Sequence, residues 1–294
     1  MQVEPIVREV AERFGLSLHA WERIVRSEGD PVLVLRLDDR SGASWFLKEV
    51  QHHSRRQGMD SLFAQLATVS VQRSRLLLPV AHGSGRFVLS WEERSFLLFP
   101  WVDLTTPIDG HVPHDALIEA VKELHESMAD LALPSMPGRT YEGWLRVGVD
   151  GVASRLGDTA PLVRPFRAFL DDRLAHIVGP EVNIHGDVHR HNLAVDPQGK
   201  LVILDFDLAR PGPAVQDFVG ATGIYTTLHE GRIRLEEPRL EKLLGQLQSS
   251  STKIEARDAR MLLCRTWIGP LRGPGFPEDE ARRLLLSLWR FVGE

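Results

Sequence analysis

The chain has 294 residues, which is long enough to bury a sizeable core and to form two lobes. Apolar residues make up 43% and charged residues 26%, as in ordinary globular proteins, and the net charge of −5 argues against a general nucleic-acid binder. One cysteine cannot form an internal disulfide, the charged amino terminus lacks a signal-peptide core, and no apolar run reaches membrane-spanning length. We therefore expect a cytoplasmic protein with no nucleic-acid or membrane partner.

The first fifty residues predict one helix followed by strands. Apolar side chains recur at helical spacing within residues 3–14, and Gly15 is suited to end that helix. Runs typical of β-structure follow at residues 18–25, 32–37 and 44–50. Lys48 lies near the end of the third run, where a lysine on its own is usually just solvated.

The next fifty residues predict a helix and three more strands. Apolar residues share one helical face within residues 59–66. Strands are expected at residues 76–80 and 86–91, and a buried strand at residues 95–101. These elements extend the same sheet-rich region.

The remainder of the chain is predicted to be mainly helical. Residues 114–131 have a strong apolar face, whereas residues 132–160 are rich in proline and glycine and predict loops with a short helix near Trp144. Such loops near a cleft can shape a substrate pocket. Further helices are expected at residues 166–177, 239–248, 256–268 and 278–291.

The most informative stretch covers residues 182–210. It contains His185-x-Asp187 with Asn192 five residues after the aspartate, and then a turn-forming Asp-Pro-Gln-Gly at residues 196–199 between two short apolar runs. The second run leads directly into Asp205. A hairpin with this turn places Asn192 beside Asp205, and Asp187 enters the same place on a loop. Three oxygen-bearing side chains are thus expected to converge.

Phosphoryl transfer requires such a cluster. Mg²⁺ bridges the phosphates and prefers carboxylate, amide and water oxygens at about 2.1 Å, and a separate carboxylate orients the attacking hydroxyl and accepts its proton. Kinases use an aspartate, an asparagine five residues later and a further metal-binding aspartate, which is the order found here. We therefore expect Asp187 as catalytic base, Asn192 and Asp205 as Mg²⁺ ligands, and Asp207 as a further ligand through a second ion or a bound water.

A zinc site is the rival chemical interpretation. His185, Asp187, His189 and His191 alternate within seven residues, and imidazole and carboxylate are zinc ligands. Strict alternation in a loop rarely aims four groups at one point, however, and zinc leaves the asparagine and the later aspartates unexplained. The kinase interpretation accounts for all of them.

The form HGDxHxxN followed by LDFD resembles the aminoglycoside phosphotransferase and choline kinase family. The resemblance extends from about Lys48 to Asp217. It implies an α+β, bilobal, protein-kinase-like fold with a small mixed-sheet lobe at residues 1–101 and a mainly helical lobe at residues 102–294. ATP would bind between the lobes, with Mg²⁺ as the metal cofactor.

The same resemblance implies roles for other residues. Lys48 would grip the nucleotide phosphates, and the Pro100 carbonyl and the Trp101 N–H would hold adenine. Asp217 would brace the catalytic loop. Residues 27–31 stand where a phosphate-covering loop would lie, although they contain one glycine and not a glycine-rich pattern.

One position departs from the family pattern. Family members generally place a glutamate on the helix after the lysine, as its ion-pair partner. Here that register falls on Met59, with Asp60 adjacent and Gln65 further on. Either Asp60 replaces this glutamate as the partner of Lys48, or the alignment with the family is shifted here, and the sequence leaves both open. His125, near an apolar stripe, is expected to be a packed core residue.

The phosphate acceptor has several candidates. The segment LDFDLARPGPAVQD is most similar to the bacterial stress response kinases, which implies Ser/Thr of a protein as acceptor. A small-molecule hydroxyl kinase for an amino alcohol, sugar or aminoglycoside is the alternative, and a catalytically silent nucleotide-binding module is another. The tight acidic groups at residues 171–172 and 278–280 each have arginines nearby, which disfavours polycationic aminoglycosides. The sequence carries no signal of oligomeric state.

Overall fold

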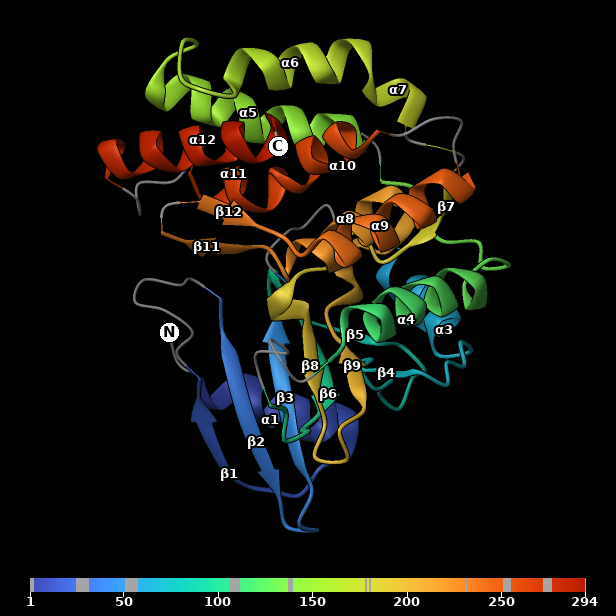
Figure 1. The fold of residues 1–294 in the computed structure, drawn as a ribbon. Helices are drawn as coiled ribbons and strands as arrows, with labels where there is room; N and C mark the ends of the chain where they lie inside the picture. Colours follow the sequence, from blue (N-terminus) through green and yellow to red (C-terminus); the bar gives the residue numbers. More distant parts are fainter. Residues whose placement is uncertain are drawn as a thin grey trace.

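A computed structural model gives the fold shown in Figure 1. The structure describes residues 3–24, 32–50, 58–105, 112–136, 140–177, 179, 181–230, 232–250, 255–271 and 277–293. The expected phosphate-covering loop at residues 27–31 lies outside these ranges. Strands dominate the first part of the chain and helices the remainder, which confirms the predicted α+β class. In the described ranges, no helix is both long and apolar enough to cross a membrane.

Five antiparallel strands form the amino-terminal sheet in the order β1-β2-β3-β6-β5. The strands are β1 (Leu18–Arg23), β2 (Val34–Asp39), β3 (Ser44–Glu49), β5 (Val88–Trp91) and β6 (Arg94–Pro100). Lys48 of β3 lies opposite Val34 on one side and Leu97 on the other. The lysine is therefore held in a central strand by ladders on both edges.

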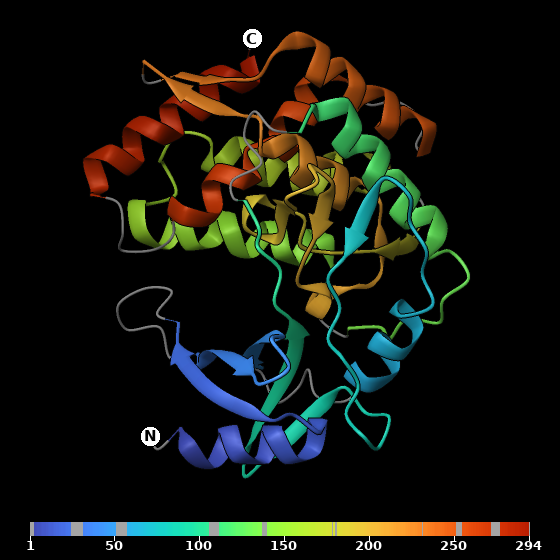
Figure 2. The ribbon, with the colours of Figure 1, turned by 90° about the horizontal axis from the view of Figure 1, so that it is seen from below.

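Helix α1 (Glu4–Phe14) covers one face of this sheet (Figure 2). Ile6, Val7 and Val10 are its buried residues, and they pack with apolar side chains of β2, β3 and β6. Burying each is worth roughly 1.5–3 kcal/mol. The helix ends at Gly15, whose φ of 65° suits glycine and lets its N–H cap the last turn.

The opposite face of the sheet shares its core with the helical part. Helix α3 (Met59–Leu66) and the side chains of Leu97 and Phe99 belong to one apolar cluster that continues into the carboxyl-terminal helices. Gln65 on α3 also exchanges two hydrogen bonds with the main chain of Ala132, at 3.1 and 2.7 Å. Lobes divided after Trp101 remain a proposal, because this core runs across the division.

A three-stranded sheet connects the two parts. Strands β8 (Leu193–Val195) and β9 (Leu201–Ile203) form the predicted hairpin, and β4 (Ser74–Leu76) runs parallel to β9. The strand predicted at residues 76–80 was wrong beyond Leu76. The Leu77 N–H still donates to the Ile203 carbonyl of β9. The main chain then leaves β9, and the Val80 N–H donates to the Leu98 carbonyl of β6.

The helical part contains several elements that position the site. They are α4 (His114–Ser127), α5 (Tyr141–Leu156), α6 (Val163–Asp172), α7 (Leu174–Ile177), α8 (Val215–Gly223), α9 (Glu237–Ser250), α10 (Ala256–Leu263), α11 (Arg265–Leu271) and α12 (Glu278–Gly293). Between them, β7 (Glu181–Ile184) pairs with β10 (Arg210–Pro213), and β11 (Thr227–His229) pairs with β12 (Arg232–Arg234). The last hairpin was not predicted.

The short helix predicted near Trp144, within residues 132–160, is present as α5 and is longer than expected. Thr140 caps its first turn by accepting from the Gly143 N–H at 3.0 Å. Tyr141, Leu145 and Val149 then recur at four-residue spacing and are buried. Tertiary packing of this face outweighs the low helix propensity of the glycines.

Candidate active site

A buried aspartate holds the loop that carries the predicted catalytic base. Asp217, in the first turn of α8, accepts hydrogen bonds from the N–H groups of His185 and Gly186 at 2.7 and 2.9 Å. Its second interaction is with the His125 ring at 2.9 Å. Burial raises the pKa of Asp217, but His125 and the backbone donors outweigh burial and lower it. These contacts agree with the expected bracing by Asp217 and with a packed, structural His125.

Gly186 is required by the close approach of two neighbours. Its φ is 82°, and an added Cβ would lie 2.2 Å from the Arg210 guanidinium and 2.5 Å from the Leu208 carbonyl. The Gly186 carbonyl also accepts from the Gln216 amide. The loop is thus fixed from both sides, and this explains why no larger residue stands between His185 and Asp187.

Asp187 is oriented by its neighbours on the same loop. Asn192 ends a short 3₁₀ helix, η1 (Arg190–Asn192), and its Nδ2 donates to the Asp187 carbonyl and carboxylate at 3.0 and 3.2 Å. The His189 Nε2 lies 3.5 Å from the same carboxylate. Burial raises the pKa of Asp187, while His189 outweighs this and lowers it. Asp187 is therefore ionised at neutral pH and can accept a proton.

Asp205 and Asp207 follow strand β9 and lie beside Lys48. The lysine Nζ lies 2.7 Å from Asp205 Oδ2 and 3.4 Å from Asp207 Oδ2. Burial lowers the pKa of Lys48, but the two carboxylates outweigh it and raise the pKa. Burial raises the pKa of Asp205, and Lys48 reverses this to a lowered value. Lys48 and Asp205 are therefore both charged at neutral pH.

These side chains meet at one end of the β8–β9 hairpin. The Leu204 N–H donates to the Asn192 carbonyl at 2.9 Å, so the hairpin register brings the residues before β8 and after β9 together. Asp187 lies close enough for the charge of Asp205 to influence its pKa. The convergence expected from the sequence is present, and the catalytic and metal-binding roles remain proposals.

The donor set fits a hard divalent cation. Among the described residues, Asp205 Oδ1 is buried with no hydrogen-bond partner. Asn192 uses its amide nitrogen on Asp187, which leaves its amide oxygen for a metal. Asp205 also has φ 61°, an unusual backbone region for a residue other than glycine, and such strain is common at ligand sites. Carboxylate and amide oxygens of this kind suit Mg²⁺.

A zinc site is not formed by the alternating histidines. Both ring nitrogens of His185 are engaged within the protein, one with the Leu204 carbonyl at 2.8 Å and one with the Asp187 N–H at 3.2 Å. His189 likewise accepts from the His191 N–H. Across the part of the chain that the structure describes, no group of three His, Cys, Asp or Glu residues is arranged to hold a metal.

Asp60 does not take the place of the missing glutamate. Its carboxylate accepts from Arg86 and from the N–H groups of Phe87 and Val88, at 2.7–2.9 Å. Met59, which occupies the glutamate register, is buried in the core. The carboxylates beside Lys48 are instead the two aspartates of the hairpin.

The expected adenine donor is occupied. The Trp101 N–H donates to the Ser44 carbonyl at 2.9 Å, which extends the pairing of β6 with β3. N–H and C=O groups of one strand residue point to the same side, and neighbouring residues alternate. The Pro100 carbonyl therefore points away from β3, and the next N–H on that side belongs to Val102. The role of the Trp101 N–H needs revision for this reason.

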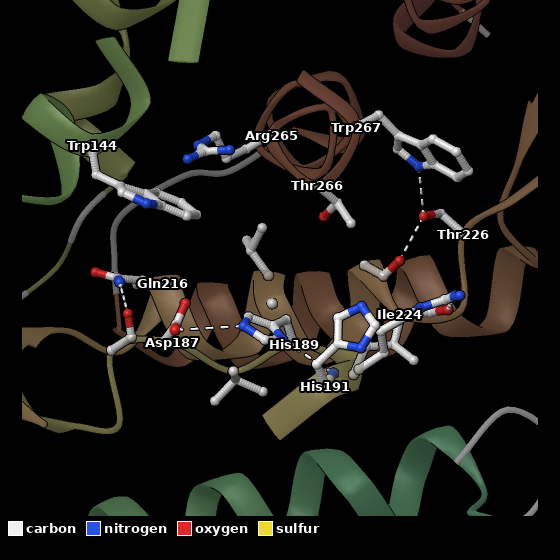
Figure 3. A pocket seen from close by; sticks show the side chains of 16 residues that line it. Trp144, Asp187, His189, His191, Gln216, Ile224, Thr226, Arg265, Thr266 and Trp267 are labelled. Atoms are coloured by element: carbon white, nitrogen blue, oxygen red, sulfur yellow. Dashed lines mark hydrogen bonds and ion pairs between the residues drawn. The ribbon is translucent and has the colours of Figure 1, made fainter. Parts of the chain in front are cut away.

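A pocket of about 390 Å³ opens beside Asp187 (Figure 3). Its lining includes Trp144 from α5 and Arg265 and Trp267 from the α11 region, together with His189 of the catalytic loop. The indole N–H of Trp267 donates to the Thr226 hydroxyl at 2.9 Å at the pocket wall. These residues come from segments far apart in the chain, and no local pattern links them.

Two glycines on α8 bring the pocket walls together. An added Cβ at Gly220 would lie 2.2 Å from the Val188 carbonyl of the catalytic loop. One at Gly223 would lie 2.3 Å from the Thr266 hydroxyl of α11. The glycine face of α8 therefore packs against the loop of Val188 at one turn and against α11 at the next turn. Their spacing of three residues is a signal that sequence reasoning missed.

Comparisons with known proteins agree with this architecture. The model of a family described as the phosphotransferase enzyme family matches residues 23–249. No curated protein matches the chain. Similar solved structures include a spectinomycin phosphotransferase in complex with ADP and spectinomycin, at 13% identity and TM-score 0.62, with 100% of this chain and 98% of that one covered.

Two further structures extend the comparison. A choline kinase from Streptococcus pneumoniae has 12% identity and TM-score 0.60, with 99% and 98% of the two chains covered. A microcompartment-associated aminopropanol kinase has 15% identity and TM-score 0.56, with 98% and 95% covered. Together they confirm the predicted kinase-like fold.

Proposed function

Because the chain belongs to the phosphotransferase enzyme family, we propose that it transfers the γ-phosphate of ATP to a hydroxyl of a small molecule, with Mg²⁺ as cofactor. One observation carries the proposal. Asp187 lines an acceptor-sized pocket, and its carboxylate is also bonded to Asn192, at the hairpin end that carries Asp205. The Asp187 carboxylate thus lies between the pocket proposed for the acceptor and the residues proposed to bind the metal and the phosphates.

The residues divide the work of the transfer. The Asp187 carboxylate orients the acceptor hydroxyl and accepts its proton, and His189 keeps that carboxylate ionised. The Asn192 amide oxygen and the Asp205 carboxylate would hold the metal, with Asp207 beside them. Mg²⁺, when bound, neutralises charge that develops on the phosphates. Catalysis rests on positioning and charge, with no covalent enzyme intermediate.

Lys48 changes partners in this proposal. It pairs with Asp205 and Asp207 in the structure. Asp205 and Asp207 would hold the metal, and Lys48 would then contact the nucleotide phosphates. The adenine edge would be read by the Pro100 carbonyl as acceptor and by the Val102 N–H as donor, in place of the Trp101 N–H.

A small-molecule acceptor replaces the protein acceptor expected from the sequence. The similar structures name spectinomycin and kinases of choline and aminopropanol, all small molecules. The pocket beside Asp187 is about 390 Å³, which is in the range of small-ligand sites. Both observations support the alternative over Ser/Thr of a protein.

The test is phosphoryl transfer by the purified protein. Wild type and Asp187→Asn are incubated with Mg²⁺ and ATP labelled at the γ-phosphate, against hydroxylated small molecules and generic protein substrates. We expect label on a small molecule with wild type only, while both proteins gain thermal stability from Mg²⁺ and ATP. Stabilisation without any turnover in wild type would favour the silent nucleotide-binding module, to which the missing glutamate at Met59 points.

A further inference from the structure

The lining of the pocket beside Asp187 carries more positive than negative side chains. Its lining contains one acidic residue, Asp187 itself, and two arginines, Arg190 and Arg265. Two arginines against one aspartate give the wall a formal charge of +1 when the two lining histidines are neutral. A cationic acceptor would meet net repulsion here, whereas an anionic group would be attracted.

The acidic groups at residues 171–172 and 278–280 do not line this pocket. Asp171 pairs with Arg146 at 2.5 Å, and Glu278 pairs with Arg282 at 2.8 Å. Neither acid lines the pocket. Polycations such as aminoglycosides need several carboxylates around them, and among the described residues the pocket offers only the catalytic one.

Arg265 is a fixed and buried positive charge in the pocket wall. Its exposed fraction is 8%, and its guanidinium carbon lies 3.7 Å from the centre of the Trp144 ring. Trp144 in turn stacks on Tyr141, with the ring planes 24° apart. The Cβ position of Gly148 is only 3.4 Å from Arg265 Nε, so a glycine there leaves room for the arginine against α5. Figure 3 shows the guanidinium beside Trp144, across the pocket from Trp267.

This arrangement suits recognition of an oxyanion. A guanidinium is planar and presents paired N–H donors that match a carboxylate or phosphate, and stacking on an aromatic ring holds its plane in place. Between Arg265 and Asp187, the wall is largely aromatic and aliphatic, with Trp144, Val219 and Ile224 among its members. An occupant would therefore join a hydroxyl near Asp187 to an anion near Arg265 through an apolar body.

Resting on the phosphotransferase function proposed above, we propose that the acceptor is a hydroxylated small molecule that carries a carboxylate or phosphate, and that Arg265 binds this anionic group. The apolar body of the acceptor lies against Trp144. Arg190 adds to the positive potential at the pocket. The acceptor class thus differs from the cationic substrates that a family resemblance alone would suggest.

The test uses probes that share one skeleton and differ in charge. They are 4-(hydroxymethyl)benzoate, 4-(hydroxymethyl)phenyl phosphate, the uncharged 4-(hydroxymethyl)benzamide and the cationic 4-(hydroxymethyl)benzylamine. Phosphorylation of each by the full-length protein is measured with Mg²⁺ and ATP, together with the thermal shift that each probe causes. We expect kcat/KM for an anionic probe to exceed that for the amine by about 100-fold. The ratio between carboxylate and phosphate probes identifies the anion.

Variants connect the preference to Arg265. In Arg265→Lys and Arg265→Gln, the anion-to-amide ratio should fall by about 10-fold or more, mainly through KM. Arg146→Gln is the matched control, since this arginine lies on α5 outside the pocket lining and pairs with Glu142 and Asp171. Arg190→Gln, at an exposed position, gives a second reading if the buried variant unfolds, and should lower the same ratio.

Two failures can be told apart. Asp187-dependent ATP turnover with equal or better use of the amine, or an unchanged ratio in both arginine variants that fold, overturns the anionic acceptor and leaves the phosphotransferase intact. An absence of Asp187-dependent ATP turnover with every probe and with water overturns the proposed function, and the acceptor inference with it.

Discussion

The Lys48 ammonium lies 2.7 Å from the Asp205 carboxylate, although the two residues are 157 positions apart in the chain. The contact joins a central strand of the amino-terminal sheet to the end of the β8–β9 hairpin. Asp207 lies 3.4 Å from the same ammonium. A lysine in this place neutralises the carboxylates that we assign to the metal, and it sets up the first prediction.

Lys48→Met should lower both activity and stability. The variant leaves Asp205 and Asp207 close together without their cation, so its Tm in metal-free buffer should fall below that of wild type. Mg²⁺ should then raise the Tm of the variant more than that of wild type, and kcat/KM should fall on the order of 10²–10³-fold. Calorimetry with and without Mg²⁺ checks the first part. Lys242→Met is the control, because that lysine pairs with Glu119 at the surface and should change neither quantity.

His189 should control the pH dependence through Asp187. In wild type the pKa of Asp187 is below its ordinary value of 3.8, so the base stays ionised and activity is lost only as pH falls through that lowered pKa. His189→Gln removes the group that lowers the pKa, while burial, which raises it, remains. The acidic limb of kcat/KM should therefore move to higher pH. The exposed His229→Gln serves as control, and an unmoved limb in His189→Gln would show that His189 does not tune the base.

Asp217→Asn should destabilise the fold. The carboxylate is fully buried and holds two backbone N–H groups and His125, so losing its charge should cost about 3–5 kcal/mol of unfolding free energy. Because the pKa of Asp217 is lowered, its contribution is present above the ordinary carboxyl pKa and is lost as pH falls through the lowered one. Urea denaturation of the variant measures the cost, with the exposed Asp171→Asn expected to change stability by less than about 1 kcal/mol.

Gly220→Ala should displace the catalytic loop. The new Cβ would lie 2.2 Å from the Val188 carbonyl, and a shift of the loop by about 1 Å can reduce kcat on the order of 100-fold. Gly245→Ala, on α9, places its Cβ in open space and should stabilise the protein by about 0.5–1 kcal/mol without affecting kcat. Steady-state kinetics and urea melts of both variants check this pair. Normal kcat in Gly220→Ala would mean that α8 does not support the loop.

The sequence predicted the parts of the site that local geometry determines. Asn192 and Asp205 flank one hairpin whose turn residues were readable, and Asp187 is five positions away, so their convergence followed from short-range rules. The residues of the acceptor pocket could not be found this way. Trp144 and Arg265 meet because α5 packs against α11. The two residues are 121 positions apart in the chain, so no local sequence pattern encodes their contact.

Three departures from the sequence-based predictions have the same origin in three-dimensional packing. The proline- and glycine-rich composition of residues 132–160 predicted loops with a short helix near Trp144, but burial of one face extends that helix to α5, Tyr141–Leu156. Which main-chain N–H groups after β6 are open to a ligand depends on which of them point toward β3. The Trp101 N–H points toward β3, because it donates to the Ser44 carbonyl. Asp60 looked available to Lys48 in sequence, but it faces β5 and binds Arg86 instead. Each correction depends on which face or edge of a helix or strand packs against its neighbours, and this is determined by tertiary structure.

The most direct test of the metal-assisted transfer is ³¹P NMR of Asp205→Asn beside wild type, each with ATP, Mg²⁺ and an acceptor that wild type uses. Asn keeps the size of the side chain and tolerates the left-handed backbone of φ 61°, so the fold should be retained. We predict ADP and a new phosphomonoester signal in equal amounts with wild type, and neither with Asp205→Asn. Transfer by Asp205→Asn at the wild-type rate, or transfer by wild type that persists when EDTA removes Mg²⁺, would contradict the account.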